Sequence, residues 1–178
     1  MADHVKGSSY KEFPISMQKG ILLHRQIDSY TDGDEIVKRS KRRLHARYGH
    51  YKGVIIDIVY DHFLARDWER YHDQPLEEFS RDFYKQLKAH WSYLPEKVQN
   101  LSHHMINQDW LTSYSHLQGI QQVLRGMNRR TGGKSQMDLA MEDLRNFNHE
   151  FGEDFHQFFE KLRIFCHQKR EEINEQFN

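Results

Sequence analysis

Two carboxylates, those of Asp57 and Asp61, lie in the most apolar stretch of the chain. They are four residues apart, so a helix places both on one face. The other residues of segment 54–64 are almost all apolar, which predicts that this helix is largely buried. Two neighbouring carboxylates that lose water repel each other and need a cation, a proton or a positively charged partner. A metal ion meets this need, and so does a buried salt bridge to Arg25 or Arg66.

A second pair, His24 and Asp28, repeats the four-residue spacing earlier in the chain. Imidazole nitrogens and carboxylate oxygens are the ligands of many metal ions that carry out hydrolysis. Taken together, the two pairs predict a hydrolytic metal site. The alternative for His24 and Asp28 is an exposed ion pair that includes Arg25 and performs no chemistry.

A further histidine, His62, directly follows Asp61. Successive residues of a helix point about 100° apart, so His62 and Asp61 can serve one site only if it lies between their directions. The sequence is equally compatible with a structural histidine at this position.

Helices are the expected elements, because the chain of 178 residues has only three prolines and ten glycines. No segment alternates apolar and polar residues with the period of a strand. The apolar periodicity predicts helices over residues 16–30, 34–48, 54–71, 75–87, 95–105, 117–127 and 144–165. We therefore expect an all-α fold, a single-domain helical bundle over residues 1–178.

The formal net charge is zero, but charges of the two signs are separated along the chain. Residues 138–160 contain seven acids and one base, whereas residues 37–56 contain no acid. The bases of this second segment are Lys38, Arg39, Lys41, Arg42, Arg43, Arg47 and Lys52. Such a run is a solvated helix face, or a surface for an acidic protein or for nucleic acid. We expect no nucleic-acid partner, because no aromatic platform or known binding motif accompanies the run.

A single cysteine, Cys166, excludes an internal disulfide framework and fits a reducing compartment. It lies in an apolar helical pattern, so we expect a buried thiol rather than a nucleophile. No signal peptide is recognisable, and no apolar run is long enough to cross a membrane. These features predict a cytoplasmic protein with no membrane partner.

Several short blocks of residues occur in a recognisable order along nearly the whole chain. The first half contains Ala2-Asp3-His4-Val5-Lys6-Gly7, His24-Arg25-Gln26-Ile27-Asp28 and Asp61-His62-Phe63-Leu64. The second half contains Trp110-Leu111, Tyr114, Gly126-Met127 and Arg129-Arg130. In these blocks the chain resembles the acyl carrier protein phosphodiesterases, also called holo-acyl-carrier-protein hydrolases.

The resemblance implies an all-helical fold distantly similar to HD-domain phosphohydrolases, and a divalent cation, Mn²⁺ or Mg²⁺. It also implies hydrolysis of the phosphodiester that joins 4′-phosphopantetheine to a serine of acyl carrier protein, which yields the apo carrier and free 4′-phosphopantetheine. The residues that would hold the cation, or lie next to its ligands, are Asp3, His24, Asp28, Asp57, Asp61 and His62. Two alternatives remain open: a nucleotide phosphohydrolase, and a non-catalytic helical binding protein whose acids form salt bridges.

Further roles follow from the resemblance. Arg25 would offset charge that builds on the phosphoryl oxygens, and His62 would donate a proton to the leaving serine oxygen. Asp3 rests wholly on the resemblance and is otherwise a surface acid. Family members usually carry a further segment, with a histidine-containing helix, before the Asp3 block, so one family metal ligand is expected to lack a counterpart here, which leaves activity of this form open.

The implied partner is acyl carrier protein, which is acidic. Complementary charge steers the encounter of two proteins. The docking residues predicted on this ground are Lys38, Arg39, Lys41, Arg42, Arg43 and Arg47.

Overall fold

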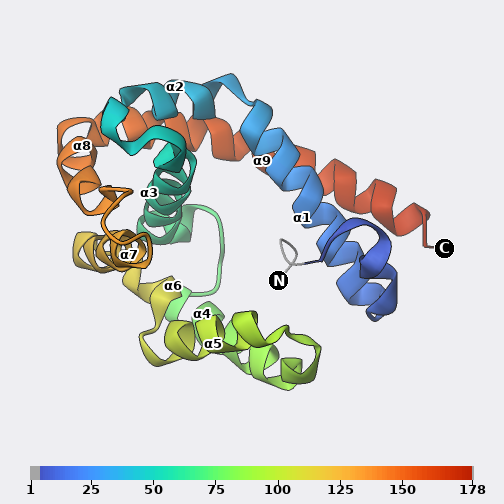
Figure 1. The fold of residues 1–178 in the computed structure, drawn as a ribbon. Helices are drawn as coiled ribbons and strands as arrows, with labels where there is room; N and C mark the ends of the chain where they lie inside the picture. The colour runs from blue at the N-terminus through green and yellow to red at the C-terminus, as the bar shows by residue number, and fades with distance from the viewer. Residues whose placement is uncertain (1–4, 178) are drawn as a thin grey trace.

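The computed structural model describes residues 5–177, and every regular element in that range is helical (Figure 1). The α-helices are α1 (Ile15–Gly33), α2 (Glu35–Arg43), α3 (Lys52–Arg66), α4 (Leu76–Ala89), α5 (Glu96–Asn107), α6 (Trp110–Ser113), α7 (Leu117–Arg130), α8 (Ala140–Asn146) and α9 (Asn148–Glu175). Short 3-10 helices cover Gly7–Glu12, Ala46–Tyr51, Trp68–Arg70, Trp91–Tyr93 and Met137–Leu139. The prediction of an all-α fold is confirmed.

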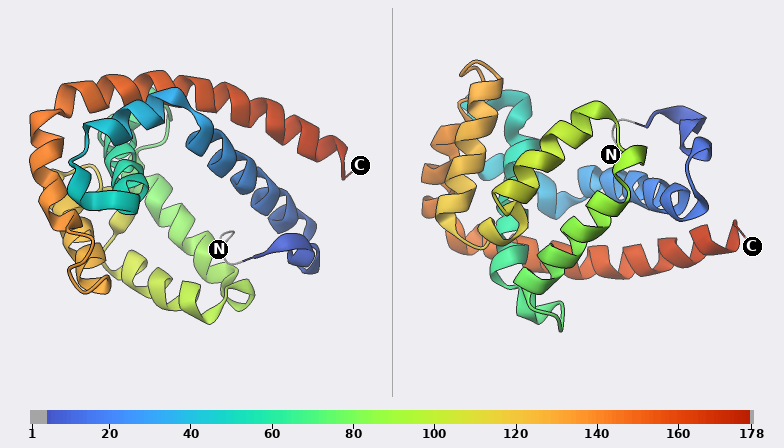
Figure 2. Two further views of the ribbon diagram at one scale, coloured as in Figure 1. Left: turned by 45° about the horizontal axis from the view of Figure 1, so that its top comes forward. Right: turned by 90° about the horizontal axis from the view of Figure 1, so that it is seen from below.

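The long helix α9 is the common support of the molecule, because α1, α2, α3 and α8 all pack against it. Helix α3 also contacts α2 and α7, and α7 contacts the short helix α6. Figures 1 and 2 show α4 and α5 as a pair that lies apart from α9, joined to the rest through α6 and through the segment that leads from α3 into α4. None of the helices in residues 5–177 has the length and apolar character needed to cross a lipid bilayer.

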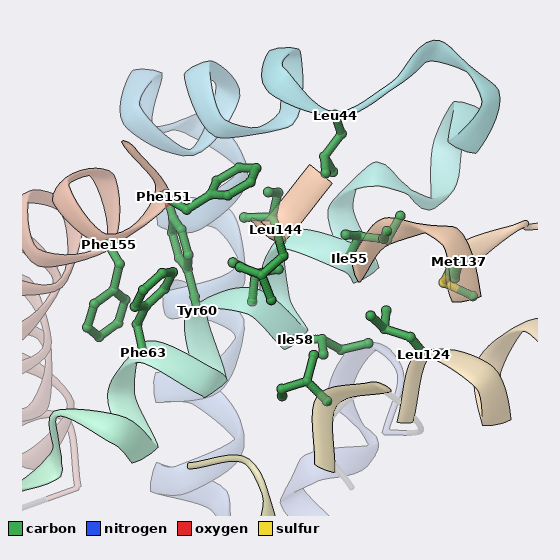
Figure 3. Packing of buried hydrophobic residues seen from close by; sticks show 14 of the residues in the cluster. Leu44, Ile55, Ile58, Tyr60, Phe63, Leu124, Met137, Leu144, Phe151 and Phe155 are labelled. Carbon is green, nitrogen blue, oxygen red and sulfur yellow. The ribbon is translucent and has the colours of Figure 1, made fainter. Parts of the chain in front are cut away.

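The main hydrophobic core surrounds α3, as its apolar sequence predicts (Figure 3). Ile55, Ile56 and Phe63 have no exposed surface, and the rings of Phe63 and Phe155 stack with centroids 6.0 Å apart. Leu124 brings α7 into the same core. Full burial of one such side chain contributes about 1.5–3 kcal/mol, so this core holds α3 firmly in place.

Helix α2 begins as the sequence predicts and ends earlier. The Asp34 carboxylate caps it, since its Oδ1 accepts a hydrogen bond from the Ile36 backbone N–H at 2.7 Å. The helix predicted over residues 34–48 is wrong beyond Arg43, because Leu44 is extended (φ −69°, ψ 140°) and buries its side chain. Tyr48 follows in a 3-10 helix and donates a hydrogen bond to Asp143 Oδ2 at 2.5 Å.

The last predicted helix, over residues 144–165, is two helices. Phe147 leaves helical geometry (φ −119°, ψ 27°) and separates α8 from α9. The apolar stripe hides this break, because Leu144 before it and Phe151 after it pack into the same core. Cys166 of α9 is half-buried rather than buried, and burial raises the pKa of its thiol.

Candidate active site

The Asp57 and Asp61 carboxylates occupy a solvent-exposed face in the middle of α3. Both residues are exposed, whereas Ile58, Val59 and Phe63 between and beside them are buried. The prediction of a buried face for the two acids is therefore wrong: the apolar residues bury the other faces of α3. This arrangement leaves two acids on a rigid helix with access for a ligand.

The protein raises the pKa of both acids. For Asp61 the pKa rises to about 7, first because surrounding protein atoms displace water and then because Asp57 repels its charge. Desolvation also raises the pKa of Asp57, and Asp32 and Asp28 raise it further against the opposing charge of Lys41. Asp61 keeps accessible surface and is still crowded by protein, so it is reachable and poorly hydrated at once.

No ion pair within residues 5–177 neutralises Asp57 or Asp61, which disfavours the salt-bridge alternative. Arg66 pairs instead with Asp67, with Nη2 2.7 Å from Oδ2. Arg25 Nη2 donates to the Val5 carbonyl at 2.7 Å, and the Arg25 guanidinium lies over the Tyr10 ring at 5.4 Å. Arg25 thus attaches the start of the described chain to α1.

Helix α1 contributes the second predicted pair. His24 Nδ1 lies 2.9 Å from Asp28 Oδ2, and both side chains are about half exposed. Asp28 is close enough to Asp57 to raise its pKa, although α1 packs on α2 and α9 rather than closely on α3. Lys41 of α2 pairs with Asp32 at 3.1 Å and lowers the pKa of Asp57, so it lies between the acids of α1 and those of α3.

The predicted metal site stays a prediction. Within residues 5–177 no three His, Cys, Asp or Glu side chains are gathered closely enough to hold a metal ion. Asp3, the ligand that rests on the family resemblance, lies outside the described residues. The acids of α1 and α3 thus share an electrostatic environment without forming a complete set of ligands.

His62 points away from this environment. Its ring is buried, and its Nδ1 lies 2.7 Å from the Tyr114 carbonyl oxygen, which can only accept a hydrogen bond. Desolvation lowers the pKa of His62, partly opposed by that hydrogen bond, and its charged neighbours are Arg66, Asp67 and His116. The predicted role of His62 as proton donor is untested. The interaction that the structure shows is the hydrogen bond from His62 to the backbone of Tyr114.

Tyr114 is the residue that sequence reasoning left without a role. Burial raises the pKa of its phenol, and the charge of Asp61 raises it further. The hydroxyl of Tyr84 accepts a hydrogen bond from the Leu111 N–H and donates one to Asp109 Oδ1, both at 3.0 Å, which fixes α6. The signal in the sequence was the pairing of Trp110-Leu111 with Tyr114, quoted above as a family block.

The basic run of α2 is partly neutralised inside the protein. Asp154 of α9 is buried and accepts hydrogen bonds from Arg39, Arg43 and Ser40, the last at 2.7 Å. Lys38 pairs with Glu35 at 2.9 Å. The docking prediction for this run is untested, but four of its six residues already have acidic partners: Lys38, Arg39, Lys41 and Arg43.

Comparison with known proteins assigns the family. The family model described as "Acyl carrier protein phosphodiesterase" matches residues 1–162. Proteins of that name from Pectobacterium atrosepticum and Photorhabdus laumondii are 29% and 31% identical to this chain, covering 91% and 89% of it and 84% and 81% of their own lengths. No solved structure matches the chain. The chain belongs to the acyl carrier protein phosphodiesterase family.

Proposed function

We propose that this protein hydrolyses the phosphodiester between 4′-phosphopantetheine and the carrier serine of holo-acyl carrier protein. Membership of the family supports this substrate. The observation that carries the proposal is the pair Asp57 and Asp61, which lies open to solvent on α3 without an ion-pair partner in the described chain. Acids that are open to solvent, have a raised pKa and lie on a rigid helix are suited to binding a cation or moving a proton.

A divalent cation, Mn²⁺ or Mg²⁺, is part of the proposal. The carboxylate donors fit, because carboxylate oxygens suit these ions and because neither Asp57 nor Asp61 forms an ion pair with a described residue. Asp57 and Asp61 would hold the ion from α3, with Asp28 and His24 from α1 and Asp3 from the start of the chain. When bound, the ion would supply a water whose pKa is lowered towards neutrality.

The chain itself would orient the substrate. Arg25 is held by the Val5 carbonyl and the Tyr10 ring, and its remaining N–H groups would donate to phosphoryl oxygens. Tyr114 is protonated at neutral pH, as any phenol is, and burial and the charge of Asp61 raise its pKa further, so its hydroxyl would donate a hydrogen bond to the substrate. His62 would fix Tyr114 through the carbonyl oxygen of that residue.

The test is incubation of the protein with holo-acyl carrier protein and Mn²⁺, followed by intact mass measurement of the carrier. The expected result is conversion to the apo mass and release of free 4′-phosphopantetheine. EDTA and the variant Asp61→Asn should both stop the conversion. A nucleotide phosphodiester is assayed in parallel. If the carrier stays unchanged while the nucleotide is hydrolysed, the nucleotide alternative replaces this proposal.

A further inference from the structure

A groove of about 700 Å³ lies between α6, α7 and the end of α5. Figure 1 shows α6 leading from the α4–α5 pair to α7, next to α3. Trp110, Tyr114 and Met127 give the groove an apolar floor. Three residues of α7 give it a basic lining: Arg125, Arg129 and Arg130.

These arginines differ from most bases of the chain that the sequence singled out. All three are exposed, and none forms an ion pair with any residue of the described range 5–177. Arg130 Nη1 lies 4.0 Å from Met127 Sδ, so its guanidinium rests against the floor. Guanidinium groups without partners beside an apolar groove are prepared for a ligand that carries negative charge.

The groove adjoins the candidate active site through Tyr114. Tyr114 lines the groove and the charge of Asp61 raises its pKa, and α7, which forms one wall of the groove, packs against α3, the helix that carries Asp61. A ligand lying along α6 and α7 therefore has one end next to the acids of α3. A long, flexible substrate arm is the kind of ligand that uses such a path.

Two glycines shape the groove. A Cβ at Gly119 would lie 2.0 Å from the Ser113 carbonyl oxygen, so only glycine allows α7 to approach α6 this closely. A Cβ at Gly126 would meet nothing within 4 Å, although Gly126 lines the groove and lies inside α7. A glycine inside a helix costs about 1 kcal/mol relative to alanine. What Gly126 provides in return is open space over the floor.

We infer that the groove between α6 and α7 receives the 4′-phosphopantetheine arm of holo-acyl carrier protein, while Arg125, Arg129 and Arg130 contact acidic side chains of the carrier. This inference rests on the function proposed above. The apolar floor suits the methylene groups and the geminal methyl groups of the arm, the polar side chains of the lining suit its hydroxyl and two amides, and the free arginines suit an acidic protein.

The docking part is tested by binding of fluorescently labelled apo and holo carrier in EDTA, which prevents turnover. The double variant Arg129→Glu/Arg130→Glu should raise Kd for both carrier forms about tenfold, equivalent to ~1.4 kcal/mol. The matched control is Arg81→Glu/Arg170→Glu, which reverses two exposed arginines outside the groove. If the groove variant and the control weaken binding equally, the docking part is overturned.

The arm part is tested by Gly126→Leu, which places a branched side chain over the floor. The parent protein should bind the holo carrier more tightly than the apo carrier. In Gly126→Leu the affinity for the holo carrier should fall to that for the apo carrier, which stays unchanged. Gly126→Ala serves as the size control and should have a smaller effect. The arm part is overturned if Gly126→Leu prefers the holo carrier over the apo carrier as strongly as the parent protein does.

Two further measurements separate the possible failures. Melting temperatures show whether Gly126→Leu folds, and if it does not, Gly126→Met, whose unbranched side chain can bend, takes its place. If the parent hydrolyses holo carrier and every groove variant behaves as its control does, the groove inference alone is wrong. If the parent neither binds nor hydrolyses the carrier, the proposed function is wrong and the inference falls with it.

Discussion

Helices α2 and α7 both end in arginines, but the structure uses the two sets differently. Arg43 at the end of α2 binds the buried Asp154 of α9, whereas Arg129 and Arg130 at the end of α7 have no acidic partner in the described chain. Bases at a helix C-terminus are favourable in both cases because they oppose the helix dipole. The difference lies in what each helix packs against, and density of charge along the sequence does not reveal it.

The same distinction applies to the acids. Asp154 and Asp67 have basic partners, and Asp57 and Asp61 have no ion pair among residues 5–177. We expect charges with internal partners to contribute mainly to folding and charges without them to contribute mainly to binding.

The largest effect is expected at Asp154. Arg43→Glu would place a carboxylate against a buried carboxylate and should lower the free energy of unfolding by about 3 kcal/mol, the usual cost of breaking a buried ion pair. Arg129→Glu should lower it by about 1 kcal/mol at most, because it reverses only an exposed charge that opposes the dipole of α7. Urea denaturation of both variants measures the difference. Equal losses of stability would contradict the distinction between α2 and α7.

The second effect concerns the unpaired acids. Cation binding to the folded state should raise its stability by about 2.7 kcal/mol at a hundredfold excess over the dissociation constant. We therefore expect the melting temperature to rise with Mn²⁺, and we expect Asp61→Asn to remove most of the rise. Asp67→Asn is the control, because Asp67 is already paired with Arg66. A melting curve that millimolar Mn²⁺ leaves unchanged would count against the metal site.

The sequence predicted much of the fold and only part of the site, for reasons that particular residues make clear. Apolar periodicity identifies α3 and its buried side chains, because the packing of the apolar residues against the core stabilises the helix and also buries those side chains. It fails at Phe147, where the chain leaves and resumes a helix without turning its apolar stripe away from the core. It could not show that Arg39 and Arg43 meet Asp154, because more than a hundred residues separate the partners.

A smaller effect is expected from the free bases of α2. Arg42 and Arg47 are exposed and form no ion pair with a described residue, so Arg42→Glu/Arg47→Glu leaves the Asp154 network intact. If the carrier docks along α7, this variant should slow association by only about twofold at low salt, through long-range attraction that screening removes. Stopped-flow mixing with the carrier measures the rate. A slowing as large as that of Arg129→Glu/Arg130→Glu would restore α2 as a docking surface.

The last effect concerns the stability of the fold at acid pH, to which Asp67 contributes. The hydrogen bond from Arg66 lowers the pKa of Asp67, against desolvation, and the charges of Arg66 and His156 lower it further. Because the folded pKa lies below the unfolded value of about 3.9, Asp67 stabilises the fold above pH 4, and this contribution is lost as the pH falls through the folded pKa.

Urea denaturation between about pH 6 and pH 3 tests the direction of this pH dependence. The ion pair is partly exposed, so its contribution to the free energy of unfolding is at most about 1 kcal/mol. Asp67→Asn should be less stable than the parent at pH 6, and the difference should shrink towards pH 3. The control Asp73→Asn removes an exposed acid without an ion pair in the described chain, and its difference from the parent should stay small throughout. If the difference in stability between Asp67→Asn and the parent does not change with pH, the side chain of Asp67 stabilises the fold through its packing and not through its charge.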